Sequence, residues 1–314
     1  MTTADGAKPW LDRAVRAFGN PYLLLALTSL FWSGNHIVGR AAGGVVPPLA
    51  LSTLRWFIPS LLLWIVARHH IVRDWPTIRT HWKIMLWFGV TGGVLFTSLQ
   101  YVGLQYTSAL NVSVLNSLVP VLILGTGALI FRDRVTRLQL TGILVSSVGV
   151  IVIIAHGDLS TLRHLAFNWG DLIIVFNMAV FSIYAVYLRL RPAIHPLSLL
   201  FMLGAVSTVG TLPFAVAESL AGYTLTLNWM TVGVVGYVAI FPSLLAYAAW
   251  NRGVELIGAN RAGPYLHLIP VYTAALGYML LGENLYPFHV LGFVLILVGV
   301  YLASRKGTQD VKAA

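Results

Sequence analysis

Apolar residues dominate this chain in successive stretches, which short polar joints separate. A helix of roughly 20 apolar residues crosses the hydrocarbon core of a bilayer. Because lipid offers no hydrogen-bond partner to an open strand, such stretches are expected to be helical. Several joints carry turn-forming segments: Pro47-Pro48, Asp74-Trp75-Pro76, Pro192, His195-Pro196 and Pro287. The pattern predicts ten spans, over residues 21–42, 48–67, 83–104, 109–130, 138–155, 169–188, 196–216, 230–249, 261–281 and 287–304.

Basic residues divide unequally between the two sides of these predicted spans. Of the 20 Lys and Arg residues, 17 fall in the terminal segments and alternate joints, whereas Arg40 and Arg163 fall on the other side and Arg55 lies inside the second span. The basic joints contain Arg68, Arg73, Arg79, Lys83, Arg132, Arg134, Arg137, Arg189, Arg191, Arg252 and Arg261. Since cytoplasmic loops hold the excess of Lys and Arg, both termini are predicted to be cytoplasmic.

Composition agrees with a membrane protein and excludes several other classes. The chain is 58% hydrophobic and 10% charged, whereas soluble domains carry roughly 25% charged residues. Its net charge of +10 lies in short joints rather than in a basic stripe, which favours contact with lipid headgroups over nucleic acid. Cysteine is absent, so disulfides and thiolate metal sites are excluded. We expect no metal and no cofactor. The first span is too long for the apolar core of a signal peptide and is expected to be retained.

An internal repeat appears at an offset of 150 residues. The matching positions are Gly103 with Gly253, Pro120 with Pro270, Gly127 with Gly277, Asp133 with Glu283, Gly142 with Gly292, and Gly149 with Gly299. Five spans per repeat is an odd number, so the second copy must enter the membrane from the opposite side.

The predicted fold is therefore an all-α integral membrane protein of ten transmembrane helices in two inverted five-helix repeats. The predicted boundaries are a cytoplasmic tail over 1–20, the first repeat over 21–155, a periplasmic linker over 156–168, the second repeat over 169–304, and a cytoplasmic tail over 305–314. Inverted repeats are typical of alternating-access transporters.

Several short motifs occur in this order along the chain: Phe31-Trp32-Ser33-Gly34-Asn35, Arg55-Trp56, Tyr101-Val102-Gly103-Leu104-Gln105-Tyr106-Thr107-Ser108-Ala109, Pro120-Val121, Pro270-Val271 and Gly282-Glu283-Asn284. In these motifs and their duplication the chain resembles the ten-helix, EamA-type family of the drug/metabolite transporter superfamily, most of all the bacterial exporters of aromatic amino acids. The resemblance covers roughly 21–304 and implies a carrier in the bacterial inner membrane that moves small metabolites outward.

Polar and aromatic residues inside the spans are the candidates for substrate binding. They are Trp32, Asn35, His36, Gln100, Tyr101, Asn116, Tyr184, Tyr187, Ser243, Tyr247 and His267. With a rise of about 1.5 Å per residue, they form two groups on either side of the bilayer middle. An amino acid spanning both groups would hydrogen-bond at one end and stack its side chain on aromatics. The alternative is that these groups bond one helix to another.

His267 is the sharpest candidate, since an intramembrane histidine is a functional-site hypothesis by default and Pro270 follows it closely. It is expected either to bind a carboxylate or to bond a freed backbone carbonyl. Arg55 is expected to bridge helices or reach the outer headgroups, in keeping with the basic residue that the resembled family has there, with binding of a substrate carboxylate as the alternative. Structural or hinge roles are expected for Gly103, Pro120, Gly253 and Pro270 as well.

Transport of amino acids down their gradient is the function that this pattern favours, since no Asp or Glu lies deep in a predicted span. The alternatives are the same fold exporting drugs or other small metabolites, with or without proton coupling, a channel, and an intramembrane enzyme. The H-x4-D pair of His69 and Asp74 lies in a joint too small for a catalytic domain, so no enzyme activity is expected. The small-residue pairs Gly39–Gly43 and Gly89–Gly93 leave monomer and homodimer both open.

Overall fold

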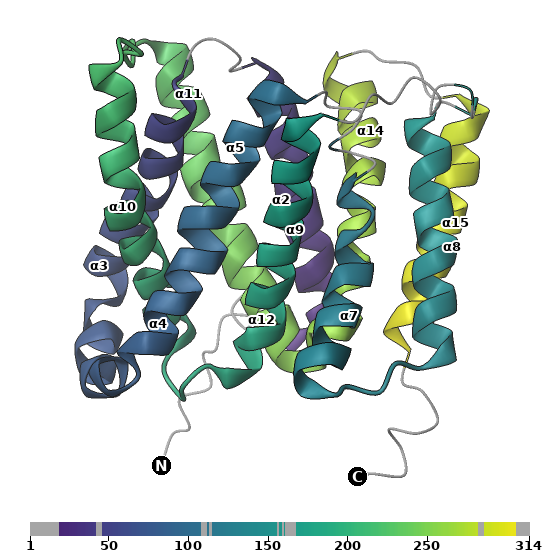
Figure 1. The fold of residues 1–314 in the computed structure, drawn as a ribbon, viewed down its shortest axis with the longest axis horizontal. Coiled ribbons are helices and arrows are strands. Elements are labelled where there is room, and N and C mark those ends of the chain that lie inside the picture. Colours follow the sequence, from purple (N-terminus) through teal and green to yellow (C-terminus); the bar gives the residue numbers. More distant parts are fainter. Residues whose placement is uncertain are drawn as a thin grey trace, which may run out of the picture.

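Helices account for all the regular secondary structure in the part of the chain that the computed structural model describes, residues 19–41, 46–107, 112, 115–155, 157–158, 160, 168–281 and 286–305. They stand side by side in an elongated array (Figure 1). The helices are α2 (Pro21–Ala41), α3 (Pro48–Thr80), α4 (Trp82–Gly89), α5 (Phe96–Tyr106), α7 (Val119–Phe131), α8 (Arg137–Ile154), α9 (Trp169–Tyr187), α10 (Pro196–Leu220), α11 (Trp229–Val238), α12 (Ala246–Ile257), α13 (Ala259–Ala262), α14 (Leu268–Leu281) and α15 (Pro287–Ser304). The π-helical segments η1 (Val90–Leu95) and η4 (Ala239–Leu245) and the 3₁₀ segments η3 (Leu188–Leu190) and η5 (Gly263–His267) join some of them.

Each predicted span contains helix, and most ends agree to within a few residues. Among the described residues, 7 continuous helical stretches are long and apolar enough to cross a membrane, and Val119–Phe131 is a shorter apolar helix. The described part of the chain is thus all-helical, and its helices are those of a multi-pass membrane protein. The predicted tails lie outside the described residues except at their inner ends, as does most of the linker predicted over 156–168.

Helix α3 is longer than predicted. The sequence places its end near residue 67, with Asp74-Trp75-Pro76 as a break, but the helix continues to Thr80 with Pro76 inside it. That prediction is wrong because packing compensates for the backbone hydrogen bond that proline removes. One face of the extension buries Ile71, Asp74 and Ile78.

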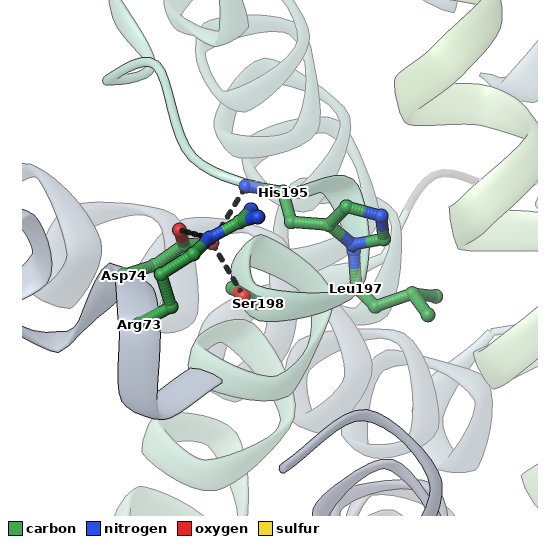
Figure 2. Close-up of polar contacts among 5 residues, drawn as sticks. All are labelled: Arg73, Asp74, His195, Leu197 and Ser198. Carbon is green, nitrogen blue, oxygen red and sulfur yellow. Dashed lines mark hydrogen bonds and ion pairs between the residues drawn. The ribbon is translucent and has the colours of Figure 1, made fainter. Parts of the chain in front are cut away.

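Asp74 joins this extension to the start of α10. Its carboxylate accepts hydrogen bonds from the backbone N–H of His195 at 2.7 Å and from the Ser198 hydroxyl at 2.8 Å, and Arg73 lies beside it (Figure 2). A carboxylate at a helix N-terminus satisfies unpaired N–H groups and complements the helix dipole. The H-x4-D residue Asp74 is therefore engaged in a structural cap.

Two π-helical segments interrupt the third and eighth predicted spans at matching positions. Adding the repeat offset of 150 to Val90–Leu95 gives 240–245, which lies within Ala239–Leu245. A π segment shifts the backbone hydrogen bonds by one residue and is common at functional sites.

Glycines bring α8 and α15 into close backbone contact. A Cβ added at Gly142 would lie 2.6 Å from the carbonyl oxygen of Gly299, and one at Gly149 would lie 2.8 Å from that of Gly292. The repeat offset relates Gly142 to Gly292 and Gly149 to Gly299, so it exchanges one contact with the other. Other packed helix pairs are related by the same offset. The packing of α5 against α9 corresponds to that of α12 against α2, and the packing of α7 against α9 corresponds to that of α14 against α2.

Candidate functional site

Five aromatic side chains from α2, α9 and α12 pack together in the middle of the helix array; we call Trp32, Phe181, Tyr184, Tyr247 and Trp250 the aromatic cluster. The Trp32 ring centroid lies 5.7 Å from those of Phe181 and Tyr247 and 5.8 Å from that of Trp250. Phe181 and Trp250 are 5.5 Å apart. Trp32 is partly exposed, whereas the other four are buried. Trp32 is thus the ring of the cluster most accessible to a ligand.

Two polar atoms of the cluster, on Trp32 and Tyr247, bond to the π segments. Trp32 Nε1 donates to the Pro242 carbonyl at 3.0 Å, and the Tyr247 hydroxyl donates to the Gly92 carbonyl at 2.6 Å. The repeat offset relates Gly92 to Pro242, so each π segment presents the equivalent carbonyl to an aromatic residue of the opposite half. The Tyr184 hydroxyl donates to Asn251 Oδ1 at 2.7 Å.

Four residues near the predicted sites were missed by the sequence analysis: Phe181, Trp250, Asn251 and Asn177. A spacing of three or four residues from Tyr184 or Tyr247 puts Phe181, Trp250 and Asn251 on the same helix faces. That spacing is the signal that identifies them.

Asn177 lies one turn before Phe181 on α9 and donates from Nδ2 to Gln100 Oε1 at 3.0 Å. The buried Oδ1 of Asn177 has no hydrogen-bond partner among the described residues. Buried polar groups are normally bonded, so this oxygen is available to a donor on a bound molecule.

Arg55, Tyr101 and Ser243 form a second group beside the aromatic cluster. Arg55 Nε donates to Ser243 Oγ at 2.9 Å, and Nη1 donates to the Tyr101 hydroxyl at 3.0 Å. The Arg55 residue is 5% exposed, and an arginine near the bilayer centre costs roughly 2.5–3.5 kcal/mol on insertion scales. These bonds connect α3 to α5 and η4.

His267 lies apart from both groups, in η5. Its Nδ1 is 2.7 Å from Ser146 Oγ on α8, and its Nε2 donates to the Ser117 carbonyl at 3.0 Å. The side chain is 1% exposed. Both ring nitrogens thus bond neighbouring segments, and Asn116, next to Ser117, is partly buried.

We predict that His267→Ala abolishes efflux while membrane insertion stays normal, because it removes the bonds that join η5 to α8 and to the segment before α7. Efflux from vesicles, normalised to the amount of inserted protein, measures the effect. His267→Gln is the matched variant, since its side-chain amide can still donate to a carbonyl, and it should retain part of the activity. Normal efflux by His267→Ala contradicts the prediction.

The remaining predicted residues occupy other positions. Tyr187 packs between Trp87 and Phe131, with both ring centroids 5.5 Å away. Asn35 is partly buried on α2, and the side chain of His36 lies outside the described residues.

The predicted hinge glycines are points of close packing. A Cβ at Gly103 would meet the Ile174 side chain at 2.7 Å, and one at Gly253 would meet Leu25 at 2.7 Å. The two prolines, Pro120 and Pro270, lie in the first turns of α7 and α14.

An ion-paired group joins the ends of several helices on the side with the excess of Lys and Arg. Arg189 donates from Nη1 and Nη2 to the two carboxylate oxygens of Asp133 at 2.8 and 2.5 Å, and Asn260 Nδ2 donates at 3.0 Å. Glu255 pairs with Arg191 and with Arg252. The hydrogen bonds from Arg189 hold the pKa of Asp133 below its ordinary value, although partial burial acts in the other direction.

We predict that Asp133→Asn lowers the free energy of unfolding at pH 7 by about 0.2–1 kcal/mol, the usual contribution of a partly exposed pair. Because folding lowers the pKa of Asp133, its contribution is complete above the ordinary value of 3.8 and is lost as the pH falls through the lower folded-state pKa. Thermal unfolding in detergent from pH 7 to pH 3 measures the difference between variant and parent. Asp158→Asn, which changes an exposed carboxylate whose bonds in the described part of the chain are to Ser160, is the control. A difference that grows as the pH falls contradicts the prediction.

The described residues contain no cluster of His, Cys, Asp and Glu that could hold a metal ion. The arrangement offers aromatic faces, backbone carbonyls, hydroxyls and one guanidinium. These groups can bind a small zwitterion with an apolar side chain.

Comparison with known proteins gives consistent results. The sequence profile described as the EamA-like transporter family matches this chain twice, over residues 20–155 and 168–305. An uncharacterized transporter of Bacillus subtilis, YyaM, is 26% identical over 292 residues, which cover 91% of this chain and 93% of that protein. Probable amino-acid metabolite efflux pumps of Salmonella typhimurium and Escherichia coli are 26% and 25% identical, and each match covers 89% of this chain and 93% of the pump.

A solved crystal structure has the same fold. Its TM-score is 0.75 at 18% sequence identity, and the match covers 90% of this chain and 96% of the solved chain.

Proposed function

Because this chain belongs to the EamA-like transporter family, we propose that it exports aromatic and other neutral amino acids across the bacterial inner membrane. The chain is a membrane transporter and not an enzyme. Relatives named as probable amino-acid metabolite efflux pumps support amino acids as the class of cargo.

The aromatic cluster is the observation that carries this proposal. Its rings come from α2 in one half of the chain and from α9 and α12 in the other, so a cargo stacked on Trp32 lies beside the packing contact between the two halves. An offset-stacked or edge-to-face aromatic pair contributes about 0.5–1.5 kcal/mol beyond its buried area. An aromatic amino acid gains most from such a site.

Alternating access between two inverted repeats is the mechanism that we propose. The glycine contacts between α8 and α15, exchanged by the repeat offset, support a twofold relation between the halves. The matching π segments support it as well, since they put equivalent carbonyls beside the cluster. We extend this to ten transmembrane helices with both termini in the cytoplasm, which agrees with the placement of Lys and Arg.

We propose that the concentration gradient of the amino acid drives export, without coupling to protons. The ion-paired carboxylates of the described residues, such as Asp133 and Glu255, lie near helix ends or in the loops between helices. None of these carboxylates contacts the aromatic cluster. A carboxylate relay for protons through this cluster would need a closer group.

Efflux from proteoliposomes preloaded with a panel of labelled amino acids tests the proposal. Saturable efflux without an imposed pH gradient is the expected result. Efflux that requires the gradient would establish proton coupling instead of facilitated export. If no amino acid leaves the vesicles, the alternative of a drug or another small metabolite as cargo replaces the proposed one.

A further inference from the structure

Arg55 differs from the arginines that form ion pairs in the described part of the chain. Arg73, Arg189, Arg191 and Arg252 each pair with a carboxylate near a helix end. Arg55 is buried inside α3, and no Asp or Glu of the described residues lies within ion-pair distance of it. An ionisable residue inside a membrane span is a functional-site hypothesis by default, and an anion is the natural partner for a buried cation that has no carboxylate beside it.

The hydrogen bonds of Arg55 leave one edge of its guanidinium unused. Ser243 Oγ accepts from Arg55 Nε and donates to the Val238 carbonyl at 2.8 Å, so the single proton of this hydroxyl is already used and is not donated to a bound anion. Nη2 makes no hydrogen bond among the described residues. Tyr101 accepts from Nη1, and its own hydroxyl proton has no acceptor among the described residues.

The position of this group relates it to the aromatic cluster. The guanidinium carbon lies 5.9 Å from the ring centroids of both Trp56 and Tyr101. Trp56 in turn packs edge-on against Tyr247 of the cluster, with their centroids 4.9 Å apart. Ser243 directly follows Pro242, whose carbonyl accepts from Trp32. Arg55 is therefore linked to Trp32 by two short paths, one through the rings of Trp56 and Tyr247 and one through the η4 backbone at Ser243 and Pro242.

We propose that Arg55 and Tyr101 bind the carboxylate of the cargo while its side chain stacks on the aromatic cluster. This inference rests on the proposed function and narrows it: the cargo must carry a free carboxylate. The Nη edge of Arg55 donates to the carboxylate oxygens, and the Tyr101 hydroxyl donates a further bond. A guanidinium suits a planar carboxylate because its N–H groups form a fixed fork. One cation is matched to one negative charge, which favours a carboxylate over a phosphate ester with two charges.

Competition in proteoliposomes tests this assignment. Efflux of labelled tryptophan from the parent protein is measured against unlabelled tryptophan, tryptophan amide and tryptamine, which share the indole and differ at the carboxylate. We expect tryptophan to compete at least about tenfold better than the amide or the amine, since a site built for a hydrogen-bonded group rejects analogues that lack it. Equal competition by all three overturns the inference.

Variants separate the role of Arg55 in binding from its role in bridging helices. Arg55→Gln should lose at least about tenfold in efflux, and tryptophan and tryptophan amide should inhibit its remaining efflux equally. Arg55→Lys keeps the charge without the fork, so it should retain part of the preference for tryptophan over the amide. Tyr101→Phe should weaken the preference by a few fold. Ser243→Ala is the matched control for the bridging bonds, because that hydroxyl does not reach the carboxylate in this assignment; it should keep the preference for the acid.

The outcomes distinguish this inference from the proposed function. If the parent protein exports tryptophan and Arg55→Gln exports it equally well with an unchanged preference, the carboxylate site is wrong and amino-acid export stands. If the parent exports no amino acid, both fail. If Arg55→Gln does not fold, the preference of the parent and of Tyr101→Phe decides, and a parent that does not distinguish acid from amide overturns the assignment.

Discussion

Replacing Trp32 by alanine is expected to reduce amino-acid efflux by at least about a hundredfold. The change removes the partly exposed ring of the aromatic cluster, together with three ring contacts and the bond from Nε1 to the Pro242 carbonyl. Each aromatic contact is worth about 0.5–1.5 kcal/mol, and a hundredfold change corresponds to about 2.8 kcal/mol. The loss includes the carbonyl left without its donor in the η4 segment.

Efflux of labelled tyrosine and tryptophan from vesicles measures this effect. Trp229→Ala is the matched control, since Trp229 is 90% exposed at the start of α11, and it should transport normally. Trp32→Phe keeps a ring but loses the indole N–H, so an intermediate rate is expected. Parent-like efflux by Trp32→Ala would show that the aromatic cluster is not the cargo site.

Replacing Gly142 by alanine is expected to destabilise the protein by about 3 kcal/mol, at the upper end of the usual cost of overpacking. The added Cβ would lie 2.5 Å from the backbone nitrogen of Ala303 and 2.6 Å from the Gly299 carbonyl oxygen. Both atoms belong to the backbone of α15, so the clash cannot be relieved by a side-chain rotation and the two helices must separate. Close approach through small residues is what holds such membrane helix pairs together.

Thermal unfolding in detergent, together with the share of protein that elutes as a single species, measures this loss. Gly292→Ala, the repeat-equivalent change, should be similarly harmful because its Cβ would meet the Gly149 carbonyl oxygen at 2.9 Å. Gly125→Ala is the control, since a Cβ there meets nothing within 4 Å. Equal stability of the Gly142 and Gly125 variants would argue against the close contact of α8 and α15.

The helices could be predicted from the sequence because bilayer thickness and the cost of burying charge constrain them strongly. The range predicted over 287–304 matches Pro287–Ser304, and that over 169–188 matches Trp169–Tyr187 to one residue. The extension of α3 could not be predicted, since residues 68–80 are polar enough for a loop. Their helix depends on the tertiary contact of Asp74 with the start of α10.

The candidate site could be predicted only in part. Residue type and depth identified Trp32, Tyr184 and Tyr247, but the partners of a side chain depend on the rotation and tilt of each helix, which packing sets. For the same reason, His267 could not be separated from the aromatic residues by residue type and depth alone. No sequence pattern predicts the π segments, although Pro242 lies in one of them.

Counterflow shows whether this chain carries amino acids by alternating access. Proteoliposomes are loaded with unlabelled tryptophan and diluted into a trace of labelled tryptophan. A carrier that alternates between two faces predicts a transient accumulation of label inside the vesicles above its outside concentration, with saturation as the unlabelled amino acid increases. Label that only equilibrates at a rate independent of the internal amino acid, or that does not enter at all, would contradict the claim that this chain carries amino acids by alternating access.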